Sequence, residues 1–114
     1  MREVGRGTKV ATAAPVRGAW RPLEDPDDVL ALMDEEPSEV IAVVADAGAT
    51  FLAPVFEDLT AVVCLSGTPL SHIGIVSRDY EVPCVMGTTI AEDLALGATV
   101  EVDCSGDDGV VRAP

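Results

Sequence analysis

The residue with the clearest chemistry is His72, the only histidine among the 114 residues. Thr68 and Pro69, shortly before it, match the N-cap and first residue of a helix, because proline lacks the N–H that a helix start leaves unpaired. His72 is therefore predicted in the first turn, where unpaired backbone N–H groups stabilise a phosphoryl group. A neutral imidazole in that place is a competent nucleophile. The simpler alternative is a surface or packing histidine with no chemical role.

The predicted helix is short and follows a buried strand. Residues 61–65 (AVVCL) form an apolar run of strand length, which ends at Ser66 and Gly67. Arg78 suits the C-terminal end of the helix as a cation, and Pro83 ends the helical pattern. The apolar face of the helix is predicted to consist of Ile73, Ile75 and Val76.

The segment 66–88, SGTPLSHIGIVSRDYEVPCVMGT, forms one continuous motif. The residues that carry the motif are Gly67, Leu70, Ser71, His72, Ile75, Val76, Ser77, Arg78, Asp79, Val82, Pro83, Cys84, Val85 and Gly87. With no insertion or deletion, the motif resembles the mobile phosphohistidine domain of the phosphoenolpyruvate (PEP)-utilising enzymes, such as pyruvate phosphate dikinase, PEP synthase and rifampicin phosphotransferase. The resemblance is strong over residues 61–112, fair over 38–60 and weak before that. It implies that His72 is the phosphorylated residue.

The same resemblance indicates which residues surround the phosphate. Thr68 and Ser71 would offer hydroxyl groups, and the backbone from Leu70 to His72 would offer N–H groups. Arg78 would be either a phosphate partner or one half of a salt bridge at the helix end, with Asp79 or a nearby acid. The candidates are Gly67, Thr68, Leu70, Ser71 and Arg78, and no metal ligands are expected among them.

Two positions depart from the family pattern. Thr68 replaces a second glycine. Leu70 stands where the dikinases and synthases carry threonine, so regulation by phosphorylation at that position is chemically impossible. The Leu-Ser-His sequence is more similar to the rifampicin phosphotransferase branch, whose acceptors include molecules other than pyruvate.

The length and composition predict one domain, residues 1–114, with a modest core built from Val, Ala, Leu and Ile, since only 4% of the residues are aromatic. The expected fold class is α/β: a swivelling β/β/α phosphohistidine domain. It would have a mixed central sheet, short flanking helices and a small β-hairpin layer from the termini.

Strands and one loop are predicted from the apolar runs. The strands are residues 4–10, 16–21, 39–45, 61–65 and 84–86, with a closing hairpin of 99–103 and 110–111. Trp20 is expected to be a packing residue. The loop 46–50 (DAGAT) is expected near His72, since the corresponding loop of the family lies there, which makes Thr50 a weak site candidate.

Three further helices are predicted from capping patterns. Asp25 and Pro26 match a helix start, and the acids at 34–36 and Pro37 match its end. Its apolar stripe is Val29, Leu30, Leu32 and Met33. A short helix over residues 51–59 would bury Leu52, Val55, Phe56 and Leu59. A third, capped by Thr88 or Thr89 and closed by Gly97, would carry Ile90, Leu94 and Leu96.

The charge of the chain is strongly negative, −13 in total. Residues 1–22 carry five of the seven cations and one acid, which leaves −17 on the remaining 92 residues. Such a surface excludes nucleic acid and anionic membranes as partners. Acidity also suits simple solubility, or docking onto basic partner surfaces.

The cysteines and the N-terminus indicate a cytoplasmic protein. Cys64, Cys84 and Cys104 lie in apolar contexts without a CxxC or Cys/His pair, so they are expected to be reduced and mostly buried. Charged residues interrupt the N-terminus, so no signal or membrane segment is expected there.

The resemblance implies a phosphoryl carrier that relays phosphate between partners through His72. A glycine loop for nucleotide is missing from the sequence, so ATP and Mg²⁺ are expected on a separately encoded ATP-grasp-type partner, and the isolated chain is expected to be inactive as a transferase. A second partner would bind the acceptor. The donor (ATP or PEP) and the acceptor stay open. The alternative is a binding or regulatory module that is never phosphorylated; a swivelling subunit of the aconitase type lacks this motif.

Overall fold

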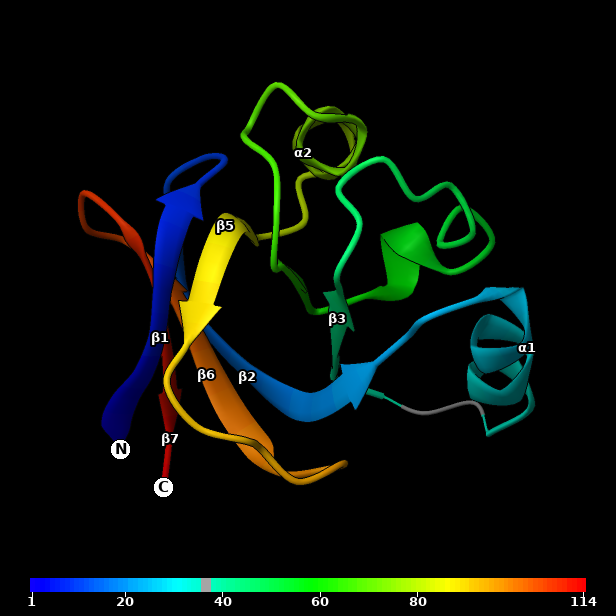
Figure 1. The fold of residues 1–114 in the computed structure, drawn as a ribbon, viewed down its shortest axis with the longest axis horizontal. Helices are drawn as coiled ribbons and strands as arrows, with labels where there is room; N and C mark the ends of the chain where they lie inside the picture. Colours follow the sequence, from blue (N-terminus) through cyan, green and yellow to red (C-terminus); the bar gives the residue numbers. More distant parts are fainter. Residues whose placement is uncertain (36–37) are drawn as a thin grey trace.

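The computed structural model describes residues 1–35 and 38–114, and its seven strands close into a barrel (Figure 1). The strands are β1 (Arg2–Lys9), β2 (Ala13–Pro22), β3 (Val40–Val44), β4 (Ala61–Cys64), β5 (Cys84–Ile90), β6 (Thr99–Cys104) and β7 (Gly109–Ala113). Their order around the barrel is β1-β5-β4-β3-β2-β6-β7, and β7 pairs with β1. The helices are α1 (Pro26–Glu35), α2 (His72–Asp79) and a 3-10 turn, η1 (Phe56–Asp58).

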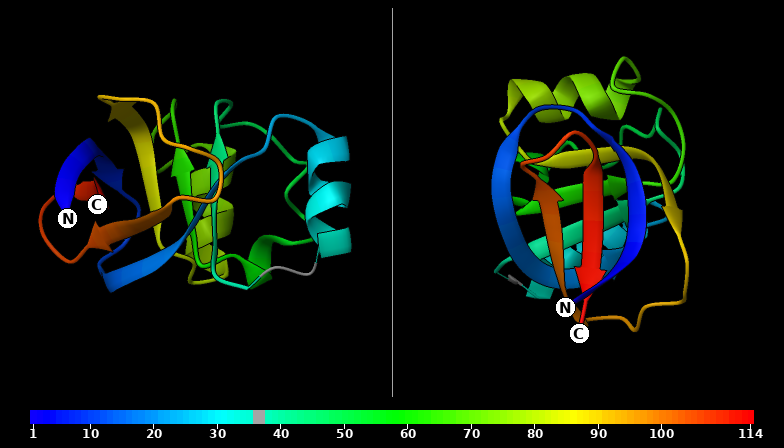
Figure 2. Two further views of the ribbon diagram at one scale, coloured as in Figure 1. Left: turned by 90° about the horizontal axis from the view of Figure 1, so that it is seen from below. Right: turned by 90° about the vertical axis from the view of Figure 1, so that its left-hand side faces the viewer.

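The barrel has a parallel half and an antiparallel half. Strands β2, β3, β4 and β5 pair in parallel, whereas β1, β6 and β7 pair only in antiparallel. Parallel neighbours need crossover connections, and these are α1, the turns before η1, and α2. The left view of Figure 2 shows β3, β4 and β5 pointing the same way, with the helices on one side of the barrel.

Two hydrophobic cores lie on opposite sides of the parallel strands. Side chains alternate along a strand, so Ile41 and Val43 point into the barrel while Val40, Ala42 and Val44 pack under the helices. All five residues of β3 are buried, as expected for a parallel strand covered on both faces. Trp20 packs inside the barrel, which confirms the packing role expected for it.

The predicted fold class is confirmed as a small mixed α/β domain, but the layered arrangement is wrong. The terminal strands were expected to form a separate hairpin layer. Instead β1 pairs with β5 through Gly5 and Ile90 and with β7 through Arg2 and Ala113, so the strands of the termini complete a single closed sheet. Closure leaves no open sheet edge.

The chain termini are held together by this pairing. Arg2 is opposite Ala113 in the sheet, and its Nη1 donates a hydrogen bond of 3.0 Å to the carbonyl oxygen of Pro114. Figures 1 and 2 show the two ends side by side on the side of the barrel away from α2.

Helix α1 begins as predicted, because the backbone N–H of Asp28 donates to Oδ1 of Asp25 at 3.0 Å. Its apolar stripe is narrower than predicted. Val29 and Leu32 are buried, whereas Leu30 is 58% exposed and Met33 45% exposed, because a helix lying on one face of a sheet buries one narrow side. The predicted end signal at Glu36 and Pro37 lies outside the described residues.

Two of the predicted short helices are wrong. Residues 51–55 form turns followed by the single 3-10 turn η1, since Pro54 cannot donate the hydrogen bond that a helix interior needs. The burial predicted for this segment is nevertheless confirmed for Leu52, Val55, Phe56 and Leu59.

The helix predicted after Thr88 is replaced by strand. Residues 84–90 are all in β5, because Thr89 and Ile90 pair with Arg6 and Gly5 of β1, and this pairing overrides the local capping pattern. Residues 91–98 then form an irregular connection in which Leu96 is 70% exposed. The closing hairpin of β6 and β7 is confirmed.

The cysteines are free and buried, as predicted. Burial raises the pKa of the Cys84 thiol to about 12, because the thiolate would lose its hydration. None of the described helices is long and apolar enough to cross a membrane.

Truncation of a side chain in the barrel core is expected to lower the free energy of unfolding much more than the same truncation on the surface. Ile41 is 0% exposed inside the barrel and Ile75 is 51% exposed on α2. Ile41→Ala should lower the free energy of unfolding by about 2–5 kcal/mol, and Ile75→Ala by less than about 0.5 kcal/mol. Urea unfolding followed by circular dichroism measures both. Equal losses would contradict the assignment of the two side chains.

The three thiols are expected to be unreactive in the folded protein, because thiolate is the reactive form and these groups are buried. At mildly alkaline pH, 5,5′-dithiobis(2-nitrobenzoate) should modify them only after guanidinium chloride is added. An Ala95→Cys variant, with the new thiol at an exposed position, should react at once and serves as the control. Fast reaction of a native thiol would contradict the buried placement.

Candidate functional site

The site is built where two parallel strands end. The loops after β3 and β4 leave the same edge of the sheet, and Ser66 joins them: its Oγ donates to the carbonyl of Ala45 at 2.6 Å and accepts from the N–H of Ala47 at 3.2 Å. The loop 46–50 therefore lies beside the His72 segment, as predicted. The role of Ser66 was missed, although a hydroxyl directly after a buried strand was a signal for it.

Gly67 makes the close approach of these loops possible. Its φ is +75°, and a Cβ there would lie 2.3 Å from the Cβ of Ala47 and 2.7 Å from the Oγ of Ser71. The N–H of Gly87 donates to the carbonyl of Ser66 at 3.0 Å, which ties the start of the loop to β5. A side chain at position 67 would separate elements that are held in direct contact.

The segment before His72 is a turn and not the start of the helix. The N–H of Ser71 donates to the carbonyl of Thr68 at 2.9 Å, which closes a four-residue turn with Pro69 in its second position. The fixed φ of proline suits this position as well as the first position of a helix, so the capping prediction for Thr68 was wrong. The helix begins at His72, with Ser71 as N-cap.

His72 occupies the first position of α2 and is exposed, so the predicted first-turn placement is confirmed. The next residue, Ile73, is 1% exposed, and its N–H donates to the carbonyl of Ala47 at 3.0 Å. The buried Ile73 fixes the helix to the loop after β3, while the imidazole beside it faces solvent. Of the predicted apolar face, Ile73 is buried and Val76 partly buried, but Ile75 is exposed.

The hydroxyl oxygens near His72 accept hydrogen bonds from backbone N–H groups. The Oγ of Ser71 accepts from the N–H of Thr68 at 2.9 Å, and the Oγ1 of Thr68 accepts from the N–H of Leu70 at 3.2 Å. Ser71 makes no side-chain cap on the helix. Each hydroxyl hydrogen stays available to an anion, and Ser71 caps none of the first-turn amides, of which that of Ile73 is bonded to Ala47.

A hollow of about 350 Å³ lies beside His72. Its walls are mainly apolar, and Thr50, His72, Asp79 and Tyr80 are its polar members. The weak candidate Thr50 is thus brought to the same hollow as His72. Asp79 and Tyr80 were not predicted as lining residues; their spacing of seven and eight from His72 along a helix was the signal for a shared face.

Comparison with known proteins decides the family. Residues 25–106, more than half of the chain, match the family described as "PEP-utilising enzyme, mobile domain". The chain belongs to this family. It is also 39% identical over 77 residues to chondramide synthase cmdD of Chondromyces crocatus, a match that covers 67% of this chain and 2% of that protein. The chain therefore spans a small fraction of this relative's length. The family makes it a phosphotransfer-related domain.

Arg78 of the mobile domain braces the helix against the barrel. Its Nη2 donates to the carbonyl of Val10, in the turn between β1 and β2, at 2.8 Å. Within the described residues it forms no salt bridge with Asp79 or another acid, so that predicted contact is wrong. The guanidinium is held at the opposite end of α2 from His72.

Leu70 is the most exposed of the large apolar side chains, at 81%, and stands in the turn two residues before His72. Of the five predicted phosphate-surrounding residues, Thr68, Leu70 and Ser71 share this turn, Gly67 directly precedes it, and Arg78 is separate. Among residues 1–35 and 38–114, no three His, Cys, Asp or Glu side chains are placed to hold a metal ion.

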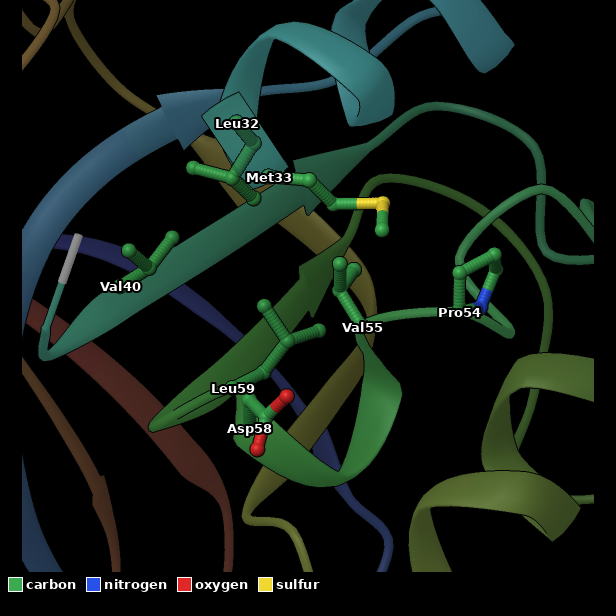
Figure 3. A pocket seen from close by; sticks show the side chains of 7 residues that line it. All are labelled: Leu32, Met33, Val40, Pro54, Val55, Asp58 and Leu59. Atoms are coloured by element: carbon green, nitrogen blue, oxygen red, sulfur yellow. The ribbon is translucent and has the colours of Figure 1, made fainter. Parts of the chain in front are cut away.

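A second hollow of the mobile domain lies away from His72. It measures about 420 Å³ and is lined by Leu32, Met33, Val40, Pro54, Val55, Asp58 and Leu59, which Figure 3 shows between α1 and the turn before β4. Asp58 is the one ionisable side chain among its lining residues.

Gly67 and Gly97 allow the close approach in the loop to be tested. Both have positive φ, but a Cβ on Gly97 would meet no atom within 4 Å. Gly97→Ala should cost about 1–2 kcal/mol of unfolding free energy from the backbone conformation alone. Gly67→Ala should cost clearly more in urea unfolding, since Ala47 and Ser71 must also move. Equal costs would show that the loops separate freely.

Proposed function

We propose that this mobile domain is a phosphoryl carrier and that His72 is the residue that carries the phosphoryl group. A nucleotide-binding partner of the ATP-grasp type would load it, with ATP and Mg²⁺ bound on that partner, and a second partner would hold the acceptor. The observation that supports this most is the position of the only histidine: exposed, at the first residue of α2, within a motif that matches the family without insertion or deletion.

The chemistry consists of two transfers. In the first, a ring nitrogen of neutral His72 attacks phosphorus, the N–P bond forms, and the P–O bond of the donor breaks with its electron pair on the leaving oxygen. In the second, an acceptor oxygen attacks, the N–P bond breaks, and the imidazole is regenerated. Splitting the transfer this way lets donor and acceptor sites be distant, because the carrier travels between them.

The turn before His72 suits the loaded state. The hydroxyl groups of Thr68 and Ser71 can donate to phosphoryl oxygens, and the amides of the first turn of α2 add a favourable field for negative charge. Arg78, bound to Val10, supports the orientation of the helix in this proposal instead of contacting the phosphate. Leu70 leaves no hydroxyl for regulation two residues before the carrier.

Labelling of the only histidine tests this function. The protein is incubated with ATP, Mg²⁺ and an extract of its source organism, and then analysed by intact mass and by acid-labile phosphate. One phosphoryl or pyrophosphoryl adduct is expected on the native protein and none on His72→Ala. A Thr68→Val/Ser71→Ala variant should label more slowly, because it loses both donors.

Chemical phosphorylation provides the control. Phosphoramidate needs no partner and should label native protein but not His72→Ala, since His72 is exposed. If His72 accepts phosphate from phosphoramidate but never from ATP in an extract whose PEP-utilising enzymes are active, the carrier function is contradicted, and a binding module that is not phosphorylated is favoured.

A further inference from the structure

The negative charge of the domain is concentrated in residues 23–81, the part of the chain that forms α1, α2 and the loops around His72. Residues 23–81 hold thirteen of the twenty acids and one of the seven cations, a net charge of −12 out of −13. Within this range β3 and β4 are uncharged, so the described charges lie on α1, α2 and the connecting turns, which Figure 2 shows on one side of the barrel.

Five of the six cations in the rest of the chain form ion pairs within the described residues, and Lys9 is hydrogen-bonded to Thr12 and Gly106. Five arginines of the terminal strands form ion pairs: Arg2, Arg6, Arg17, Arg21 and Arg112. The barrel side is close to neutral, with six cations against seven acids. The electrostatic potential in the solvent next to the helices is therefore negative, and it acts on any molecule that approaches this side.

Apolar side chains stand around His72 on this acidic side. Leu70 is 81% exposed, in a turn fixed by Pro69 and by the hydrogen bonds of Thr68, and Ile75 is 51% exposed. The hollow beside His72 adds apolar walls next to the imidazole, with Asp79 among its lining residues. An apolar centre with polar groups at its rim is the ordinary anatomy of a protein interface.

We infer that Leu70 and the hollow beside His72, together with the nearby acids Asp46 and Asp79, dock on the cationic mouth of the phosphate-binding cleft of the donor partner. The inference rests on the proposed function. A cleft that holds a nucleotide's phosphates must present Lys, Arg or Mg²⁺, so its rim is positive where the carrier has to enter. Acids on the carrier side complement that rim, and Leu70 enters first because it projects beside His72.

The inference predicts salt-sensitive loading. The initial rate of His72 labelling by ATP and extract should fall on the order of tenfold as steering is screened, between about 0.1 M and 1 M salt. Asp46→Asn/Asp79→Asn should lower the rate at low salt and reduce its salt dependence. Asp46→Asn keeps an oxygen that can accept from the N–H of Gly48, so its turn is preserved.

Matched variants on other surfaces separate docking from general effects. Asp93→Asn/Asp107→Asn removes two exposed acids outside residues 23–81 and should leave the rate unchanged. Leu70→Ser should slow loading several-fold, whereas Leu96→Ser, at 70% exposure, should not. All variants should react equally with phosphoramidate, which needs no docking.

The outcomes distinguish this inference from the function beneath it. If native protein is loaded but the rate is insensitive to salt, to Leu70→Ser and to the two Asp→Asn changes, the docking surface is wrong and the carrier function stands. If sedimentation shows that Leu70→Ser disrupts a dimer while loading is unchanged, a second copy is the occupant and the inference is wrong. If native protein is never loaded, both are wrong.

Discussion

The site depends on one constraint, the parallel pairing of two fully buried strands. Strands β3 and β4 run side by side, so their carboxyl ends deliver two loops to the same edge. Ser66, in the loop after β4, then makes two hydrogen bonds to the loop after β3 with its single hydroxyl, and Gly67 lets the loops touch. The position of His72 follows from these contacts, because Ile73 is bonded to the loop after β3.

The sequence was sufficient for the parts of the structure that local chemistry decides. Apolar runs identified the strands, and Asp25 and Pro26 identified the start of α1. Prediction from sequence failed where the secondary structure depends on pairing between distant segments, or where the same residues suit both a turn and a helix start. The register of Thr89 and Ile90 against β1 cannot be seen from capping patterns, and barrel closure requires knowing both neighbours of β1.

The candidate site could be predicted as a set of residues but not as a geometry. The motif identified His72, Thr68 and Ser71, yet Pro69 suits a turn and a helix start equally, so the first helical residue was placed three positions early. The bond from Arg78 to Val10 joins residues far apart in the chain, which no local pattern encodes. Asp79 and Tyr80 line a hollow only because the turns before η1 supply its other walls, and the sequence does not show that these segments meet.

The pairing of Arg2 with Ala113 has a mechanical consequence. Because both ends of the chain leave the barrel at one spot on the side away from α2, any tether at either end would act on the domain at a single pivot. A rigid body held at one point can rotate through a wide arc without strain in its own fold. The side of the domain that carries α2, with His72 at its first residue, would then move farther than the strands next to that pivot.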